Sequence, residues 1–342
     1  MARLHLAMNR RAFGCGVLAL PALIRSASAQ TTTVRVGKQY GLPFLPQMVM
    51  EEQKLIEKHA AQQGVPGLKA EWLTMSGPGA LNDALLGGQM EFVNVAAPSL
   101  GTLWDKTFGT PIEVHGLCAV QSMPYVLCTR NAAVKTIADF TPNDRIAVPT
   151  VKISGQAMAL QMAAAKLWGP DQYERLDALT VSMAHPDAMQ AMLSGRSEIT
   201  GHFAVSPFHY YELATPGIHQ VLKSYDTLGG KHTNGIQVAT RRFHEANPGI
   251  CAAVLNAHNE ANAFINAHPR DAAQIYVALT KDRRNPVDEL ARMVADPDVD
   301  YTTTPANVMK LIEFMHKAGR IKRMPGSWKE LFFPDVHGVQ GS

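Results

Sequence analysis

Predicted strands and predicted helices alternate along most of this 342-residue chain. The first expected helix covers residues 47–59. Three apolar, strand-like runs in the first third of the chain are each followed by a helical segment: Thr33–Gly37, Leu68–Met75 and Glu91–Ala96. Strands separated by helices of this length form right-handed βαβ units and a mainly parallel sheet. The alternation therefore predicts an α/β protein.

A break in the alternation divides the chain into two series. The strand expected at 112–120 is followed directly by another at 124–130, so the chain can change domain there. A second strand–helix series follows, and a strand at 232–240 could lead back. We therefore expect two α/β lobes, one from 30–123 and 236–342 and the other from 124–235, joined by two crossing strands near Ser122–Tyr125 and Tyr225–Gly235. The remaining chain is expected to be helical at 248–267, 270–279, 286–295 and 305–318.

The stretch Asp144–Trp168 has the composition of a strand, a polar loop and a helix start. Its loop carries Thr150, Ser154, Gly155 and Gln156. The first N–H groups of a helix have no partner inside the helix and carry partial positive charge, so this corner suits an anion. Ser154 is a good N-cap, and Gly155 lets a ligand approach the backbone. The alternative is an ordinary capped helix without a ligand.

The N-terminal residues resemble an export signal. Asn9–Phe13 contains a twin-arginine pair, a weakly apolar run extends to Leu23, and Ala27–Ala29 has the small-x-small form of a cleavage site. We expect a twin-arginine signal peptide at 1–29, a mature chain that starts at Gln30, and a periplasmic location; the alternative is a disordered basic N-terminus. Four Arg and no acidic residue lie in that leader, so the rest of the chain carries 28 basic and 29 acidic side chains. The mature chain has no basic surplus suited to nucleic acid.

The cysteines and histidines do not follow a known catalytic or metal-binding spacing. Cys118, Cys128 and Cys251 remain in the mature chain, and either Cys118 and Cys128 pair across neighbouring strands or all three are buried thiols. His202 and His209 are expected to pack among aromatic residues rather than bind a metal. The sequence contains neither a G-x-S-x-G elbow nor a Walker motif, so hydrolase and NTPase functions lack support. No cofactor and no metal are expected.

Several diffuse motifs carry a resemblance to a known family: Tyr40-Gly41, Leu85–Phe92, Pro124–Cys128, Ile137–Phe140, Arg145–Pro149 and Met189–Glu198. From about Thr33 to about Val277 the chain resembles the periplasmic substrate-binding proteins of nitrate, sulfonate and taurine ABC importers, whose fold is shared with the thiamine-pyrimidine precursor proteins. Glu91 and Glu198 occupy turn positions where that family has Asp, a mild departure outside the site. The resemblance implies a type II periplasmic binding protein fold, in which a ligand binds in the cleft between the two lobes.

The expected cleft residues lie at strand ends of both lobes. They are Gln39, Tyr40, Ser76, Gly77 and Ser99 from the first lobe, and Thr150, Ser154, Gly155, Gln156 and His185 from the second, with His202 as a further possibility. Ser76, Ser99 and Ser154 could instead be plain N-caps. Tyr40 could stack on a flat ligand, and the imidazole of His185 could face the cleft.

The function expected from these features is that of a monomeric, non-enzymatic solute-binding component of an ABC importer, whose partner is a permease in the inner membrane. The expected ligand is a small organic anion, a sulfonate or a carboxylate, and it could be aromatic because Tyr40 and Phe44 flank the first loop. Two alternatives remain: an exported enzyme of the same fold related to pyrimidine synthases, and a ligand-sensing module for a membrane sensor.

Overall fold

The computed structural model describes residues 1–2 and 32–342, and residues 32–342 belong to one compact unit. The predicted signal peptide lies almost entirely outside the described residues. In the described part, no helix is long and apolar enough to cross a membrane.

The first of two five-stranded sheets has the strand order β2-β1-β3-β10-β4. Its strands are β1 Thr33–Lys38, β2 Lys69–Thr74, β3 Phe92–Val95, β4 Val114–Ser122 and β10 Thr233–Thr240. β1 pairs in parallel with β2 and β3, whereas β10 runs antiparallel to both β3 and β4. All four residues of the central strand β3 are buried, as expected for a strand covered on both faces.

The second sheet repeats this arrangement with the order β7-β6-β8-β5-β9. Its strands are β5 Val126–Thr129, β6 Ile146–Val148, β7 Thr180–Ser182, β8 Gly201–Ala204 and β9 His219–Lys223. β6 is parallel to β7 and β8, and β5 is antiparallel to β8 and β9. The prediction of an α/β fold with two sheets is confirmed. Four of the five strands in each sheet run in the same direction, and the reversed strand is β10 in the first sheet and β5 in the second.

The chain passes twice between the sheets, first from β4 to β5 and then from β9 through α8 Ser224–Leu228 to β10. The two connections lie side by side. The backbone N–H of Ser224 donates to the Tyr125 carbonyl at 2.9 Å, and the Asn234 amide donates to the Met123 carbonyl at 3.3 Å. The exact limits of the two predicted lobes remain a prediction.

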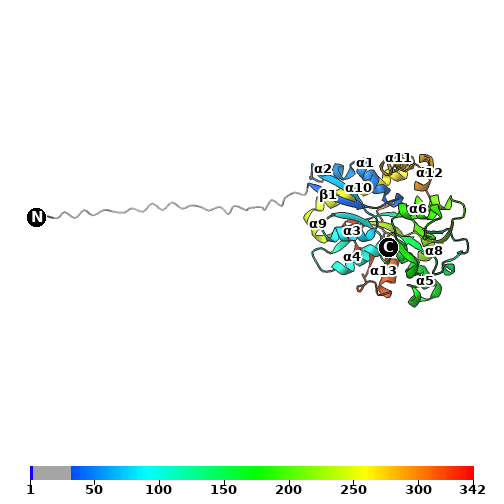
Figure 1. Ribbon diagram of the computed structural model, residues 1–342. Coiled ribbons are helices and arrows are strands. Elements are labelled where there is room, and N and C mark those ends of the chain that lie inside the picture. Colours follow the sequence, from blue (N-terminus) through cyan, green and yellow to red (C-terminus); the bar gives the residue numbers. More distant parts are fainter. Residues whose placement is uncertain (3–31) are drawn as a thin grey trace. The chain divides into compact units, whose positions relative to one another are not determined.

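Helices surround each sheet (Figure 1). Those that follow strands of the first sheet are α1 Leu45–Glu52, α2 Leu55–Gln62, α3 Pro78–Leu86, α4 Ala97–Thr107, α9 Arg241–Ala246 and α10 Pro248–Ala267. Those of the second sheet are α5 Gly155–Trp168, α6 His185–Ser194 and α7 Phe208–Leu213. The chain ends with α11 Pro269–Thr280, α12 Val287–Val294 and α13 Val308–Lys317. Short 3-10 helices occur at η1 Leu42–Phe44, η2 Ile137–Asp139, η3 Pro170–Gln172, η4 Asp177–Leu179, η5 Trp328–Leu331 and η6 Pro334–Val336.

The prediction of a single helix at 47–59 was wrong. Two helices, α1 and α2, meet at Lys54, whose φ of 51° lies in the left-handed region. A residue in this left-handed conformation cannot continue a right-handed α-helix. The hydrophobic periodicity continues across the break, so the sequence pattern did not reveal it.

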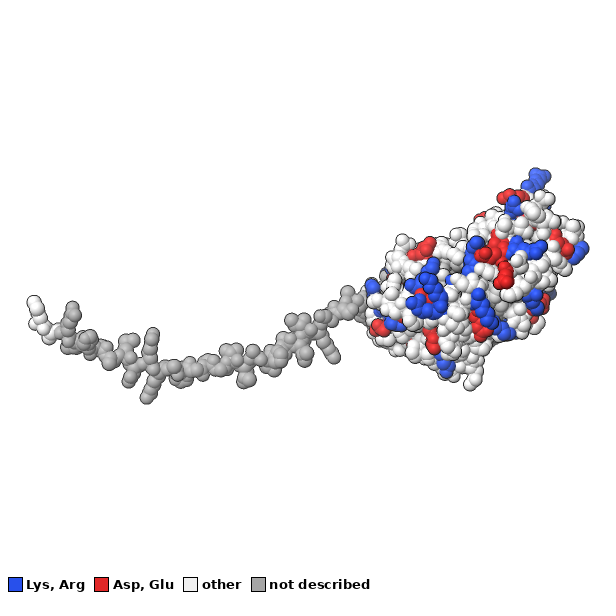
Figure 2. Space-filling model, turned by 90° about the horizontal axis from the view of Figure 1, so that it is seen from below, with Lys and Arg blue, Asp and Glu red and all other residues white. Residues whose placement is uncertain are grey.

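Cys118, Cys128 and Cys251 are buried free thiols, so the alternative of a Cys118–Cys128 disulfide is not realised. On the protein surface, Lys and Arg side chains are interspersed with Asp and Glu on the face shown in Figure 2. That face carries no large patch of one sign, in keeping with the 28 basic and 29 acidic side chains of residues 30–342.

Candidate functional site

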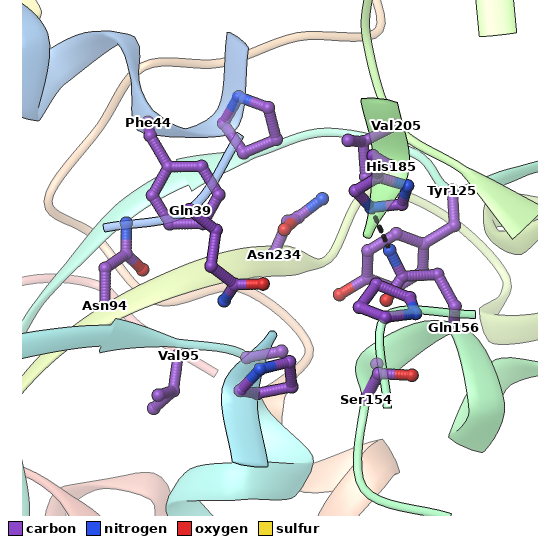
Figure 3. Close-up of a pocket in the computed structure, with 15 residues that line it drawn as sticks. Gln39, Phe44, Asn94, Val95, Tyr125, Ser154, Gln156, His185, Val205 and Asn234 are labelled. Carbon is purple, nitrogen blue, oxygen red and sulfur yellow. Dashed lines mark hydrogen bonds between the residues drawn. The ribbon is translucent and has the colours of Figure 1, made fainter. Parts of the chain in front are cut away.

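A cavity of about 40 Å³ lies where helix starts and strand ends of both sheets meet. From the side of the first sheet come Gln39, Pro43, Phe44, Pro78, Asn94, Val95 and Ala96. From the side of the second sheet come Pro149, Ser154, Gly155, Gln156, His185 and Val205. Tyr125 comes from the β4–β5 connection, and Asn234 is the second residue of β10. Figure 3 shows Gln39 and Asn94 on one side, Gln156 and His185 on the other, and Asn234 between them.

The start of α5 forms one wall of the cavity. Ser154 is its N-cap, and the serine Oγ accepts a hydrogen bond from the Ala157 N–H at 3.2 Å. The N–H groups of the first turn have no partner within the helix, and the aligned peptide dipoles place partial positive charge there. A polar wall with this potential favours an anion.

Tyr125 packs directly on the backbone of Gly155. A Cβ atom at position 155 would lie 2.1 Å from the tyrosine hydroxyl, which is far inside van der Waals contact. Only glycine lets the phenol ring reach this place beside the helix start. Burial raises the pKa of Tyr125, so the hydroxyl stays protonated and can act as a hydrogen-bond donor.

The rest of the lining mixes apolar residues with uncharged polar groups. Four side-chain amides line the cavity, those of Gln39, Asn94, Gln156 and Asn234, and the described lining contains no Lys, Arg, Asp or Glu. The Asn94 amide donates to Gln47 at 2.9 Å, which fixes its orientation. Any attraction for negative charge therefore comes from amides, hydroxyls and helix starts.

His185 is the only imidazole among the residues that line this cavity. The sequence pattern had placed His185 at the end of the preceding strand, whereas in the structure it is the first residue of α6. Its Nε2 lies 3.1 Å from Nε2 of Gln156, and its Nδ1 lies 2.7 Å from Nε2 of His202. Burial, and then the neighbouring His202 and His209, lower the pKa of His185 well below the usual imidazole value. The imidazole is therefore neutral near pH 7.

Backbone contacts close the two sides over the cavity. The N–H of Leu42 donates to the Ser206 carbonyl at 2.8 Å, and the N–H of Gly79 donates to Thr150 Oγ1 at 3.4 Å. A Cβ at Gly77 would lie 2.6 Å from the Pro149 carbonyl oxygen. The structure thus has the two sides in contact around the cavity.

A wider groove of about 960 Å³ adjoins the cavity, and Gln39 lines both. Its aromatic residues are Tyr40, Trp72, Phe208, Tyr211 and Tyr276, and its basic residues are Lys38, Lys281, Arg283 and Arg284. Glu51, Asp187 and Asp282 also line it. The groove is large enough for a drug-sized ligand, whereas the cavity holds only a small group.

The structure brings together half of the residues expected in the cleft. Gln39, Ser154, Gly155, Gln156 and His185 line the cavity, whereas Tyr40 lines the wider groove and is 37% exposed. Thr150 and Gly77 lie at the contact between the two sides, and Ser76 is exposed. Ser99 is fully buried and accepts a hydrogen bond from Asn82, so it serves the packing of α3 and α4.

Sequence reasoning missed Asn94, Tyr125 and Asn234. Asn94 had a usable signal, because it is a polar residue inside the otherwise apolar run of β3. Tyr125 and Asn234 lie at the two passages between the sheets, and only the pairing of these passages brings both residues to the cavity. His202 and His209 do pack among aromatic groups, yet His202 also bonds to His185 and Glu212. No group of three or more His, Cys, Asp or Glu within the described chain could hold a metal ion.

No family model and no curated protein matches the sequence. Solved structures do match the fold. The alkanesulfonate-binding protein SsuA from Xanthomonas axonopodis pv. citri bound to MOPS is 19% identical, with a TM-score of 0.66 over 87% of this chain and 96% of that chain. The periplasmic aliphatic sulphonate binding protein SsuA from Escherichia coli is 16% identical, with a TM-score of 0.61 over 91% of this chain and 96% of that chain.

A third similar structure is the periplasmic nitrate-binding protein NrtA from Synechocystis PCC 6803, at 15% identity and a TM-score of 0.65 over 87% of this chain and 83% of that chain. The fold expected from the sequence resemblance is therefore confirmed: the chain has the architecture of the periplasmic binding proteins. At these identities the likeness concerns the fold.

Proposed function

We propose that this chain is the periplasmic solute-binding component of an ABC importer and captures a small organic anion, a sulfonate or a carboxylate. One observation carries the proposal: a cavity between the two sheets has no Lys, Arg, Asp or Glu in its described lining and is walled in part by the α5 start, the Tyr125 hydroxyl and four side-chain amides. Such a site stabilises a negative charge through N–H and O–H donors without a buried cation. The fold, shared with sulfonate- and nitrate-binding proteins, supports the same role.

The two neighbouring spaces suggest how an organic anion would lie. The cavity of about 40 Å³ accommodates a charged head group, and the adjoining groove of about 960 Å³ accommodates an apolar body. Trp72, Phe208 and Tyr40 offer aromatic surface to that body, which favours a flat or aromatic ligand. Contacts with both sheets would stabilise the closed arrangement and make closure the signal for a permease.

Isothermal titration tests the proposal with anions, a neutral analogue and a cationic analogue. The anions are nitrate, methanesulfonate, acetate, benzenesulfonate and benzoate, and the matched controls are benzamide and benzylamine. We expect at least one anion to bind, and the amide and amine to bind at least tenfold more weakly than benzoate if benzoate is that anion. Binding of benzamide or benzylamine with no heat from any anion would contradict the proposal. Native mass spectrometry of the purified protein gives the mass of any co-purifying ligand independently.

A further inference from the structure

A buried chain of three titratable side chains leads from the cavity wall into the second sheet's core. We call it the relay: His185 at the start of α6, His202 in β8 and Glu212 in α7. The Nδ1 of His185 lies 2.7 Å from Nε2 of His202, and Nδ1 of His202 lies 2.5 Å from Oε1 of Glu212. His202 and Glu212 are fully buried, and His185 is 5% exposed. Neither His202 nor Glu212 lines the cavity.

The hydrogen bonds fix which atoms carry protons. The Gln156 Nε2 can only donate, so the His185 Nε2 that it faces must accept (dashed line in Figure 3). The proton of His185 is then on Nδ1 and is donated to His202 Nε2. His202 in turn donates its Nδ1 proton to Glu212 Oε1. Every bond in the relay is then satisfied with one proton on each imidazole and with Glu212 Oε1 as the last acceptor.

This resting relay presents the lone pair of His185 Nε2 to the cavity. Its far end is the buried carboxyl group of Glu212, which pairs with no Lys or Arg within residues 32–342 and is hydrogen-bonded by His202 and by the Cys128 thiol. The lone pair, and a negative charge on Glu212, both oppose an anion beside His185 Nε2. A single added proton on that atom turns the acceptor into a donor and makes the relay neutral overall.

The groups that surround the relay do not replace it as proton acceptors. Burial lowers the pKa of His209, in α7, to about 4. Burial, and then the neighbouring Glu212, raise the pKa of the Cys128 thiol in β5, so the thiol remains protonated. Lys223 and Asp296 act on His209 with opposite effects on its pKa. Phe208 stacks on His185 with an angle of 19° between the rings, which shields the imidazole from water.

From this geometry we infer that Glu212 is ionised in the ligand-free protein and that the protein takes up one proton from solution for each anion it binds. Glu212 and His202 then act as positioning residues, which set this stoichiometry through His185. The inference rests on the proposed anion-binding function. The proton adds to His185 Nε2, which donates it to the anion. The Nδ1 protons of His185 and His202 can then shift one step along the relay, so that Glu212 ends protonated; no other bond changes.

Proton uptake couples affinity to pH. Where one proton is taken up, the association constant rises about tenfold for each unit by which the pH falls, because proton and anion favour each other's binding equally. Glu212→Gln should remove this dependence. The glutamine amide can donate to His202 Nδ1, His202 Nε2–H then donates to His185, and His185 Nε2–H donates to the anion. All three groups are neutral in this reversed relay, so no proton is needed.

The test is calorimetric titration at one pH in buffers with different ionisation enthalpies, such as phosphate and Tris. The probe is methanesulfonate, whose acid is too strong to carry the proton itself, or the tightest-binding anion of the panel if methanesulfonate gives no heat. We expect about one proton taken up by the wild-type protein and about none by Glu212→Gln. We also expect Glu212→Gln to bind more tightly than wild type at pH 8. His209→Gln, a buried neighbour outside the relay, is the control and should keep the wild-type uptake.

The outcomes separate the inference from the proposed function. Anion binding by the wild-type protein with no proton uptake overturns the relay and leaves the anion-binding function intact. Equal uptake by wild type and by folded Glu212→Gln also overturns it. If no anion binds, the proposed function fails and the inference fails with it. The titrations of the wild-type protein in different buffers test proton uptake even if a variant does not fold.

Discussion

At the scale of single residues, the contact between Tyr125 and Gly155 links the backbone of α5 to the cavity. The tyrosine ring occupies the space that a side chain at position 155 would need. The residue types alone did not reveal this contact, because Tyr125 is 30 positions away in the chain. Sequence reasoning selected Gly155 for close approach of a ligand, whereas the nearest group in the structure is a tyrosine of the protein itself.

Gly155→Ala is expected to push the Tyr125 ring out of position and to weaken anion binding at least tenfold. The new Cβ would meet the hydroxyl at 2.1 Å, and overpacking of this kind costs about 1–3 kcal/mol. Titration calorimetry and a thermal melt measure the two effects. Gly79→Ala is the matched control, because the nearest atom to its Cβ is 3.4 Å away, an ordinary contact. Unchanged affinity in Gly155→Ala would show that Tyr125 does not take part in binding.

At the scale of elements, local sequence signals predicted those helix limits that depend on neighbouring residues. Residues 248–267 were predicted as a helix, and α10 has those limits, because Pro248 and Pro269 bound an uninterrupted apolar pattern. The break at Lys54 was not predictable, since a left-handed residue leaves no mark in hydrophobic periodicity. The relay could not be predicted from the sequence for another reason. Its three residues lie on a strand and two helices, and only the packing of α6 and α7 against the second sheet brings them together.

Ser154, the N-cap of α5, should contribute separately to the stability of the protein and to anion binding. Ser154→Ala removes the N-cap hydrogen bond to Ala157 and should lower the free energy of unfolding by about 1 kcal/mol. It should also weaken anion binding, because Ser154 lines the cavity. Thr240→Ala removes the corresponding cap of α9, where the threonine Oγ accepts from Phe243, outside the cavity. It should cost similar stability at unchanged affinity; equal affinity in both variants would mean that Ser154 is a cap alone.

At the scale of the whole molecule, two sheets with the same strand order border one cavity. The sequence predicted the two series and the two passages between them, because each is a matter of segment order. It did not predict the insertion of β10 and β5 into the interior of the two sheets, since strand pairing depends on contacts far apart in the chain. This insertion places Asn234 and Tyr125 at the cavity.

The central claim is that a small anion is held between the two sheets by the start of α5 and the groups around it. A crystal structure of the protein with the tightest-binding anion tests this most directly. We expect the charged group within hydrogen-bond distance of the α5 backbone N–H groups and of His185 Nε2, with any apolar part directed into the groove beside Trp72. An anion bound elsewhere, with the cavity beside Gly155 filled by the protein's own side chains, would contradict the account.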